Sequence, residues 1–356
     1  MNSIPPGSTI GILGGGQLGR MIAIAAAQLG YRTHIYAPEV SGPAADVSPR
    51  WTCGDYADAD ALTRFAGEVD VITYEFENVP EASVALLSGL GHVRPDARAL
   101  GIAQDRLAEK RFVEDLGGRT APFHAVGSLD ELESAIDVIG SDAILKTCRF
   151  GYDGKGQARI ADPGDAVGAW NLIGRQPAIL EGFVHFGSEF SVILARGSTG
   201  EIRFWDSAVN VHADGILALS TVPASETLTD HVAEARGLAR QVAEALDYVG
   251  VLTLEFFASV DGPVFNEMAP RVHNSGHWTI EGAVTSQFEN HVRAICGLPL
   301  GDTSLAASRV EMRNLIGPQA DDWATILADP VNHLHLYGKG EARPGRKMGH
   351  VTRLYL

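Results

Sequence analysis

Cysteine is scarce in this sequence. Among 356 residues there are three, Cys53, Cys148 and Cys296, an odd number with no C-x-x-C pair. This usage argues against a disulfide scaffold and against a thiolate zinc site. It fits a reducing compartment, so a cytoplasmic protein is expected.

Long apolar runs and positive charge are also lacking. No uninterrupted apolar run approaches the roughly 18 residues that a membrane helix needs, and MNSIPPGST has no signal-peptide pattern. Lys and Arg number 28 against 44 Asp and Glu, which gives a formal charge of −16. Neither a membrane nor a nucleic acid is therefore an expected partner. A phosphate ligand would need cations, backbone amides or a metal ion gathered at one place.

The chain is long enough for two or three domains. Over the first hundred residues, strand patterns at 9–13, 31–37 and 70–76 alternate with helical patterns, which predicts a parallel α/β sheet. Farther on, strand-like runs at 189–196, 202–209, 249–259 and 263–270, with one helix at 229–246, predict a mostly antiparallel α+β region.

A glycine fingerprint lies near the start, in IGILGGGQLGRM. Gly14, Gly16 and Gly19 spell G-x-G-x-x-G between a strand pattern and a helical pattern. A dinucleotide site also needs an acid at the end of the second strand, and Glu39 lies beyond a proline there. Three interpretations remain open: a dinucleotide, another phosphorylated ligand, or purely structural glycines.

A second glycine loop follows a lysine. In AILKTCRFGYDGKGQ, Lys146 lies in a strand pattern and Lys155 in a loop with Gly151, Gly154 and Gly156. Such a loop suits a polyphosphate, although a hairpin with exposed lysines has the same pattern. Glu181 in ILEGFV marks either a hinge that reads an adenine edge or an ordinary buried strand.

Two acids interrupt apolar strand patterns. Glu255 in VLTLEFFAS and Glu267 in VFNEMAP are joined through SVDGP, so a hairpin would bring both onto one face. Buried carboxylates need a counter-charge, and Asn266 adds a hard oxygen ligand, which together favour Mg²⁺. The alternative is an edge hairpin with two solvent-facing acids.

A polar run, RVHNSGHWT, comes directly after. Arg271, His273, Asn274, Ser275 and His277 offer donors to a small anion, whereas H-x-x-x-H alone is weak support for zinc. The late run RPGRKMGH, with Arg346 and Lys347, either closes the same pocket or forms a surface turn.

These motifs together resemble a known family. GILGGGQLGRM, YEFENVP, DRLAEK, GYDGKGQ, NEMAPRVHNSGHWT and RPGRKMGH resemble the N5-carboxyaminoimidazole ribonucleotide synthetases, ATP-grasp enzymes of purine biosynthesis. The resemblance implies three domains: an N-terminal parallel α/β domain (1–105), a small lid (106–185) and a larger, mostly antiparallel C-terminal domain (186–356).

The resemblance also implies a reaction and its ligands. ATP would phosphorylate bicarbonate to carboxyphosphate, and the amine of 5-aminoimidazole ribonucleotide (AIR) would then take up the carboxyl group. Mg²⁺ is the implied metal, on Glu255 and Glu267. The implied ATP contacts are Arg106, Lys146, Gly151, Tyr152, Asp153, Gly154, Lys155, Gly156, Gln157, Glu181, Gly182, Phe183, Val184, Glu189, His212, Asn266 and Glu267.

Catalytic and AIR-binding roles follow from the same resemblance. Asp153, Lys155, Arg271, His273 and Lys347 would act on bicarbonate, carboxyphosphate and the AIR amine. The implied AIR contacts are Gly16, Gln17, Leu18, Glu75, Asn274, Ser275 and Arg346. A homodimer is implied as well. Competing hypotheses are another ATP-grasp ligase with a different acceptor, an NAD-dependent oxidoreductase, and a catalytically silent nucleotide-binding subunit.

Overall fold

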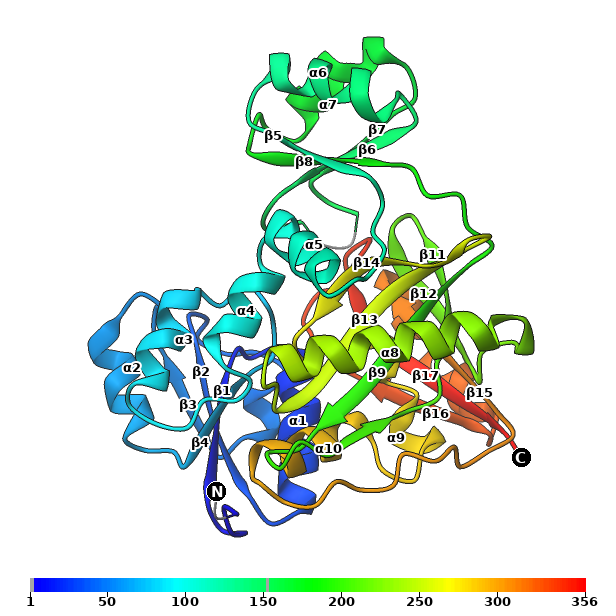
Figure 1. The fold of residues 1–356 in the computed structure, drawn as a ribbon. Helices are drawn as coiled ribbons and strands as arrows, with labels where there is room; N and C mark the ends of the chain where they lie inside the picture. Colours follow the sequence, from blue (N-terminus) through cyan, green and yellow to red (C-terminus); the bar gives the residue numbers. More distant parts are fainter. Residues whose placement is uncertain (1–2, 152–153) are drawn as a thin grey trace.

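Three β-sheets organise the computed structural model, which describes residues 3–151 and 154–356 (Figure 1). The N-terminal segment carries one sheet, the central segment a second, and the remainder a third. Tyr152 and Asp153, both expected at the glycine loop, lie outside the described residues.

The first sheet is parallel, with strand order β3-β2-β1-β4, as the alternating pattern predicts. Its strands are β1 (Thr9–Leu13), β2 (Arg32–Ala37), β3 (Arg50–Cys53) and β4 (Val71–Tyr74). Its helices are α1 (Gln17–Gln28), α2 (Ala59–Ala66), α3 (Glu81–Ser88) and α4 (Ala97–Ala103). The sequence pattern missed β3, because RWTC is short and only half-buried and so has no apolar run.

Helix α5 (Arg106–Asp115) leads from this sheet toward the second one (Figure 1). Asp105 separates it from α4, because its side chain accepts hydrogen bonds from the Leu107 and Ala108 amides and so caps the new helix. The inward face of α5 carries Glu109 and Lys110, both almost fully buried. Charged residues buried at that point belong to a site rather than to a core.

The second sheet is antiparallel, with strand order β5-β8-β6-β7. Its strands are β5 (Phe123–Val126), β6 (Ala143–Thr147), β7 (Gln157–Ile160) and β8 (Ala178–Gly182), and its helices are α6 (Leu129–Ile139) and α7 (Ala166–Leu172). Figure 1 shows this small α/β unit projecting above the rest of the chain. Ser128 caps α6 by accepting a hydrogen bond from the Glu131 backbone amide.

The third sheet has nine strands in the order β14-β13-β9-β11-β12-β15-β17-β16, and β10 pairs with β9. The strands are β9 (Ser188–Arg196), β10 (Ile202–Phe204), β11 (Ala208–Ala213), β12 (Ile216–Val222), β13 (Gly250–Ser259), β14 (Gly262–Ala269), β15 (Arg309–Ile316), β16 (Asn332–Leu336) and β17 (Lys347–Tyr355). Its pairings are all antiparallel, as predicted. The run expected as one strand at 202–209 is two, β10 and β11, because Trp205 turns into the core and donates to the Thr285 carbonyl.

Four helices accompany the third sheet: α8 (Thr229–Ala245), α9 (Thr279–Gly282), α10 (Gln287–Ile295) and α11 (Trp323–Ala328). Short 3₁₀ turns complete the chain at Ala45–Val47, Pro163–Asp165, Glu226–Leu228, Asn274–Gly276 and Gly317–Asp322.

Helix α10 joins the first and third sheets. It packs against α1 on one side and β13 on the other. His291 Nδ1 accepts from the Val251 amide, so Nε2 carries the proton and donates to Thr73 on β4 over 2.8 Å. Burial lowers the pKa of His291 to about 4, which keeps this bridge neutral. The N-terminal unit is thereby fixed against the large sheet.

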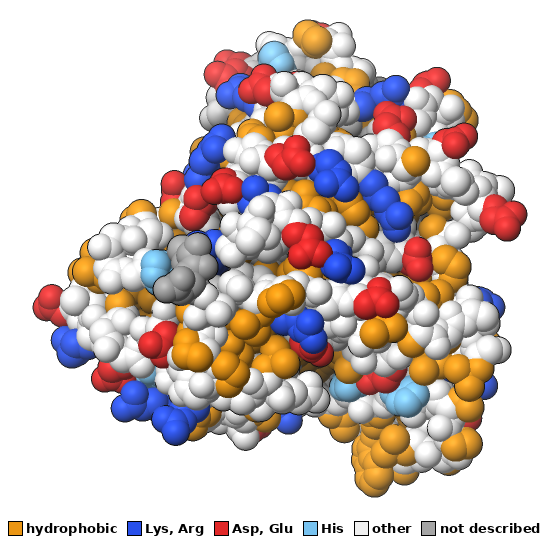
Figure 2. Space-filling model, turned by 60° about the horizontal axis from the view of Figure 1, so that its bottom comes forward, with side chains coloured by type: hydrophobic (Ala, Val, Ile, Leu, Met, Phe, Trp, Pro, Cys, Tyr) orange, Lys and Arg blue, Asp and Glu red, His pale blue; other side chains and the backbone are white. Residues whose placement is uncertain are grey.

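The surface carries interspersed charge. On the face in Figure 2, basic side chains lie among acidic ones, without a continuous basic surface among the residues described there. Across residues 3–151 and 154–356, no helix combines the length and apolar character needed to cross a membrane.

The domain boundaries expected from the sequence, at 105/106 and 185/186, stay a prediction.

Candidate active site

Three neighbouring cavities lie where the sheets meet. The first, of about 870 Å³, is bordered by the start of α1, the segment after β4, the β13–β14 hairpin and the loop before β17. The second, of about 500 Å³, lies at Gly14–Gly16 and Trp51. The third, of about 330 Å³, lies between the second and third sheets. Seven residues line both the first and the third cavity: Arg106, Lys155, Glu255, Glu267, His273, Asn274 and Lys347.

A buried ion-pair cluster forms one wall of the third cavity. Lys146 on β6 and Glu181 on β8 are joined at 2.9 Å, and Lys110 from α5 approaches the same carboxylate oxygen at 3.4 Å. Burial by itself favours a protonated Glu181, but the two lysines outweigh it and lower the pKa to about 2. Glu181 is therefore a fixed anion, and its Oε1 atom has no hydrogen-bond partner within the described chain.

The glycine loop between β6 and β7 approaches the same cavity. Gly154 and Gly156 have φ angles of 76° and 70°, which favour glycine. A Cβ on Gly156 would come within 2.7 Å of Thr147 Oγ1, so the loop closes tightly against its own strand. Lys155 lies between these glycines and lines both the first and third cavities.

The two acids in the strand patterns face each other. Glu255 on β13 pairs directly with Glu267 on β14, which confirms the predicted hairpin and its shared face. Burial and the Glu267 carboxylate raise the pKa of Glu255 to about 7. Arg106 lies 3.3 Å from Glu267 and offsets part of the charge.

This acid pair, whose charge is only partly offset, fits a bound cation. No group of three or more His, Cys, Asp or Glu side chains with metal-binding geometry occurs in the described chain. A divalent ion on Glu255 and Glu267 would complete its coordination with phosphate oxygens and water, which is the habit of Mg²⁺. Asn266, next to Glu267 on β14, lines the third cavity, and its backbone carbonyl accepts a hydrogen bond from Lys110.

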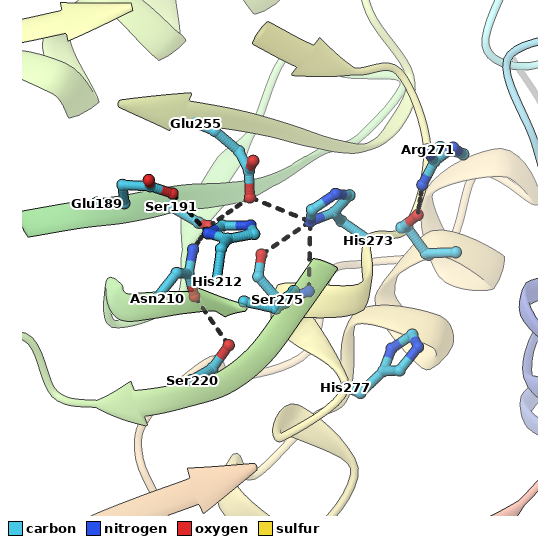
Figure 3. Close-up of polar contacts among 12 residues, drawn as sticks. Glu189, Ser191, Asn210, His212, Ser220, Glu255, Arg271, His273, Ser275 and His277 are labelled. Atoms are coloured by element: carbon cyan, nitrogen blue, oxygen red, sulfur yellow. Dashed lines mark hydrogen bonds and ion pairs between the residues drawn. The ribbon is translucent and has the colours of Figure 1, made fainter. Parts of the chain in front are cut away.

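A hydrogen-bonded chain orders the acid on β13 (Figure 3). Ser220 donates to Asn210, Asn210 donates to Ser191, and Ser191 donates to Glu255 Oε1 over 3.2 Å. These side chains come from β12, β11 and β9, so the antiparallel sheet itself aligns them. This series of hydrogen bonds fixes the rotamer of Glu255 before any ligand binds.

Glu189 and His212 lie beside this chain in Figure 3, 2.6 Å apart. Burial alone would lower the pKa of His212, but the hydrogen bond with Glu189 and the nearby Glu255 raise it above its usual value. Both residues line the third cavity. They therefore offer a nucleotide one acceptor and one charged donor.

The polar run after β14 borders the first cavity. Arg271 is ion-paired with Glu77 from the segment after β4, so its guanidinium links the third sheet to the first. His273 lies 3.8 Å from Glu255 and beside Ser275 (Figure 3). Burial, Arg271 and Lys347 lower the pKa of His273 well below its usual value, so this imidazole is neutral.

The first glycine fingerprint holds an internal anion. Glu75, directly after β4, accepts hydrogen bonds from the Gly16 amide at 2.5 Å and the Gly19 amide at 2.8 Å. A Cβ on Gly14 or Gly16 would come within 2.5 Å of the Glu75 side chain. The glycines thus make room for a carboxylate at the start of α1, and Gln17 and Leu18 line the first cavity beside it.

Every lysine of the chain lies at this site. The sequence has five, Lys110, Lys146, Lys155, Lys339 and Lys347, whereas all the other basic charge is arginine. The last four line the cavities, and Lys110 binds Glu181 and the Asn266 carbonyl. In a protein of charge −16, this concentration of cations marks an anion-binding site.

The cavities gather most of the residues expected from the sequence. Those in the third cavity are Arg106, Lys146, Gly154, Lys155, Gln157, Glu181, Gly182, Phe183, Val184, Glu189, His212, Glu255, Asn266, Glu267, His273, Asn274 and Lys347. Gly151, Gln17, Leu18, Glu75, Arg271 and Arg346 line the first, and Gly16 the second. Among the expected residues that the structure describes, two line none of these three cavities: Gly156 shapes the loop, and Ser275 is fully buried beside His273.

Sequence reasoning missed several residues of the site. Lys339 lines the first and second cavities, and Arg343 lines the first. Their signal was the basic character of GKGEARPGRK, residues 338–347, of which the motif RPGRKMGH covers only the part from Arg343 onward. Lys110 carried no separate signal, because its burial depends on how α5 packs.

Three family models match successive parts of the chain. They are described as a ribonucleotide synthetase preATP-grasp domain at residues 8–104, an ATP-grasp domain at 111–288, and a phosphoribosylaminoimidazole carboxylase C-terminal domain at 311–355. Together they span almost the whole sequence. The first covers the first sheet, the second covers the second sheet and β9–β14 of the third, and the last covers most of β15 with β16 and β17.

Full-length relatives agree with these matches. The N5-carboxyaminoimidazole ribonucleotide synthase of Brucella melitensis is 52% identical over 355 residues, 99% of this chain and 98% of the relative. An ADP complex of an N5-carboxyaminoimidazole ribonucleotide synthetase superposes with a TM-score of 0.96 at 40% identity, covering 99% of this chain and 94% of that one. The Aspergillus clavatus synthase in complex with ADP and AIR superposes with a TM-score of 0.91 at 29% identity, covering 98% of this chain and 93% of that one.

Proposed function

This chain belongs to the N5-carboxyaminoimidazole ribonucleotide synthase family, and we propose that it catalyses the ATP-dependent carboxylation of the AIR amine to N5-carboxyaminoimidazole ribonucleotide, in purine biosynthesis. One observation carries the assignment to this site. Two separate cavities share a wall of two acids, a histidine and three cations, so two substrates can meet there.

ATP occupies the third cavity in this proposal. The Lys146–Glu181 pair and the backbone of Gly182–Val184 lie where an adenine would bind, and Glu189 with His212 suits the ribose. Lys155, Arg106 and the glycine loop face the phosphates. The loop would also shield the reacting groups from water when it closes over them.

AIR occupies the first and second cavities. Lys339, Arg343 and Arg346 supply positive charge for its phosphate, together with the Gln17 and Leu18 end of α1. Glu75 is a fixed acceptor for ribose hydroxyls. Burial raises the pKa of Glu75, although the Gly19 and Gly16 amides oppose that shift.

The reaction proceeds at the shared wall. A bicarbonate oxygen attacks the γ-phosphorus, the bond to the bridging oxygen breaks, and ADP leaves with that electron pair. The AIR nitrogen then bonds to the carboxyl carbon, phosphate leaves, and the amine proton passes to a base, for which we assign Asp153 with Tyr152 beside it. Arg271, His273 and Lys347 hold bicarbonate and the acyl phosphate.

The acid pair implies a metal. Mg²⁺ held by Glu255 and Glu267, with Asn266 adjacent, would supply positive charge to the transferring phosphoryl group. We also infer a cytoplasmic homodimer from the family resemblance. Light scattering after size-exclusion chromatography would measure the mass of the assembly.

The test of this function is ADP formation from MgATP, with AIR and bicarbonate each added or withheld. Turnover that requires AIR, rises with bicarbonate and yields an acid-labile carboxylated product is expected. ATP hydrolysis indifferent to AIR would assign the chain to another ATP-grasp ligase. NAD(H) binding at micromolar affinity without ATP binding would restore the oxidoreductase hypothesis. Loss of turnover in Glu267→Ala distinguishes an enzyme from a silent nucleotide-binding subunit.

A further inference from the structure

Gln287 is a fully buried amide that touches neither ATP nor AIR in the proposed arrangement. It is the first residue of α10, and it lines none of the three cavities. Its side chain nevertheless contacts the peptide that carries His273. The Gln287 side chain has no role in the chemistry described so far.

Both backbone groups of His273 bind this one side chain. The His273 amide donates to Gln287 Oε1 over 2.9 Å, and Gln287 Nε2 donates to the His273 carbonyl over 2.7 Å. His273 follows the end of β14, where the β-ladder no longer holds the backbone. The side-chain amide of Gln287 therefore takes the place of a neighbouring strand and holds both the N–H and the C=O of His273.

The second N–H of Gln287 reaches His277. Gln287 Nε2 lies 3.2 Å from His277 Nδ1, so both amide hydrogens and the amide oxygen are engaged. A flipped amide would set its NH₂ group against the His273 N–H and its oxygen against the His273 carbonyl. Only one orientation of Gln287 is therefore satisfied.

The same segment is anchored at two further points. The backbone N–H of Gln287 donates to Thr279 Oγ1, and the Thr279 hydroxyl donates to the Gly276 carbonyl. A Cβ on Gly276 would come within 2.7 Å of Gln287 Oε1, so the segment packs directly against the amide. Helix α10 also packs against α1 and β13. The Gln287 hydrogen bonds, called the clamp below, therefore hold the His273 backbone in a fixed position relative to these elements.

The position of the His273 ring follows from its backbone. Its Nδ1 accepts from the Ser275 amide at 3.3 Å, which leaves the proton of the neutral ring on Nε2. His273 lies on the wall shared by the first and third cavities. A displaced His273 backbone would move this donor away from the path between the two substrates.

We propose that Gln287 is a positioning residue, which holds His273 where bicarbonate and its activated form pass from the ATP cavity to the AIR cavity. The inference rests on the proposed function. Without the clamp, ATP still binds, because none of the residues that Gln287 contacts is assigned to ATP. The carboxyl group is then transferred less often for each ATP consumed.

Two variants and one control test this role. Gln287→Met has similar length and makes none of the three hydrogen bonds. Gln287→Glu keeps an acceptor for the His273 amide but cannot donate to the His273 carbonyl. The control is Gln241→Met, which changes an exposed glutamine within α8 that lines none of the three cavities. ATP affinity, melting temperature, ADP and carboxylated product are each measured.

For Gln287→Met we expect kcat/KM for bicarbonate to fall roughly 10²-fold, with unchanged ATP affinity and more than one ADP formed for each product. Gln287→Glu should be intermediate, and Gln241→Met should match the unmodified protein. If Gln287→Met fails to fold, Gln287→Glu carries the same test. Unaltered kcat/KM and one ADP per product would overturn the inference. So would a parallel loss of ATP affinity and activity, which indicates a merely structural role. Absence of AIR-dependent turnover in the unmodified protein would instead refute the proposed function.

Discussion

The Glu75 carboxylate accepts a hydrogen bond of 2.8 Å from the Gly19 amide, and a second one from Gly16. The start of α1 is where a dinucleotide-binding protein would place a pyrophosphate. In this chain a carboxylate from the segment after β4 already fills part of that position. The fingerprint G-x-G-x-x-G is therefore explained by an internal anion and the space it needs.

Gly16→Ala tests this explanation directly. The φ angle of Gly16 is −80°, so alanine meets no backbone strain there. The atoms nearest to its Cβ are those of the Glu75 carboxylate, with one oxygen at 2.5 Å. We expect a loss of about 1–3 kcal/mol in the free energy of unfolding and a raised KM for AIR. Denaturant unfolding and steady-state kinetics measure these two quantities.

Gly168→Ala is the matched control. Gly168 lies within α7 with nothing near its missing Cβ, so alanine should stabilise the protein by about 0.5–1 kcal/mol. If Gly16→Ala behaves like Gly168→Ala, Glu75 does not occupy the space that the structure gives it.

The strand patterns and motif positions were readable from the sequence because they depend on local order. Glu255 and Glu267 are joined by a short turn, so their pairing across β13 and β14 followed from hairpin geometry. Short β3 had no apolar run to reveal it.

Contacts between distant segments were not readable. Glu77 binds Arg271 across 194 positions, and Lys110 reaches Glu181 only because α5 packs under the second sheet. Gln287 reads as an ordinary residue at the start of a helix. Its importance depends on the path of the chain after β14, which no local pattern describes.

Glu255→Gln should stabilise the ligand-free protein while it lowers turnover. The pKa of Glu255 is raised from 4.5 to about 7, so the folded state holds this proton more tightly than the unfolded state. Stability from this group is present below pH 4.5 and is lost as the pH rises to about 7. At pH 8 the free energy of unfolding of Glu255→Gln should therefore exceed that of the unmodified protein by up to about 3 kcal/mol. The difference should disappear near pH 4.

Thermal unfolding in a chelator, repeated with Mg²⁺, checks this expectation. Mg²⁺ should raise the melting temperature of the unmodified protein at pH 8 and have little effect on Glu255→Gln. Glu133→Gln, which changes an exposed acid on α6, is the control. Equal stability of all three proteins at pH 8 without Mg²⁺ would contradict the strained acid pair.

Glu181→Gln should have the opposite dependence on pH. The pKa of Glu181 is lowered from 4.5 to about 2, so the unfolded state binds the proton more readily. This carboxylate stabilises the fold above pH 4.5, and the contribution is lost as the pH falls toward about 2. At pH 7 the free energy of unfolding of Glu181→Gln should be about 3 kcal/mol lower than that of the unmodified protein, because Lys146 and Lys110 then remain buried without their partner.

Urea unfolding between pH 7 and pH 3 measures the difference between Glu181→Gln and the unmodified protein. The difference should shrink steadily below pH 4.5. A constant difference across that range would mean that lost packing, rather than lost charge pairing, causes the destabilisation.

The lysine distribution makes the whole site chemically addressable. Lys155, Lys339 and Lys347 are partly or fully exposed and line the cavities, whereas Lys110 and Lys146 are only 1% and 9% exposed. An amine-reactive acylating reagent should therefore label only the first three side chains and inactivate the enzyme. Peptide mass spectrometry gives the rate of labelling at each position.

Ligand protection then separates the two cavities. MgATP should protect Lys155, which lies in the glycine loop of the third cavity, whereas AIR should protect Lys339, which lines the first and second. NAD(H) should protect neither residue, because the start of α1 is partly filled by Glu75. Labelling of Lys339 that AIR leaves unchanged would exclude the basic loop from the AIR site. Labelling of Lys110 or Lys146 at the rate of Lys339 would mean that the buried cluster around Glu181 opens in solution.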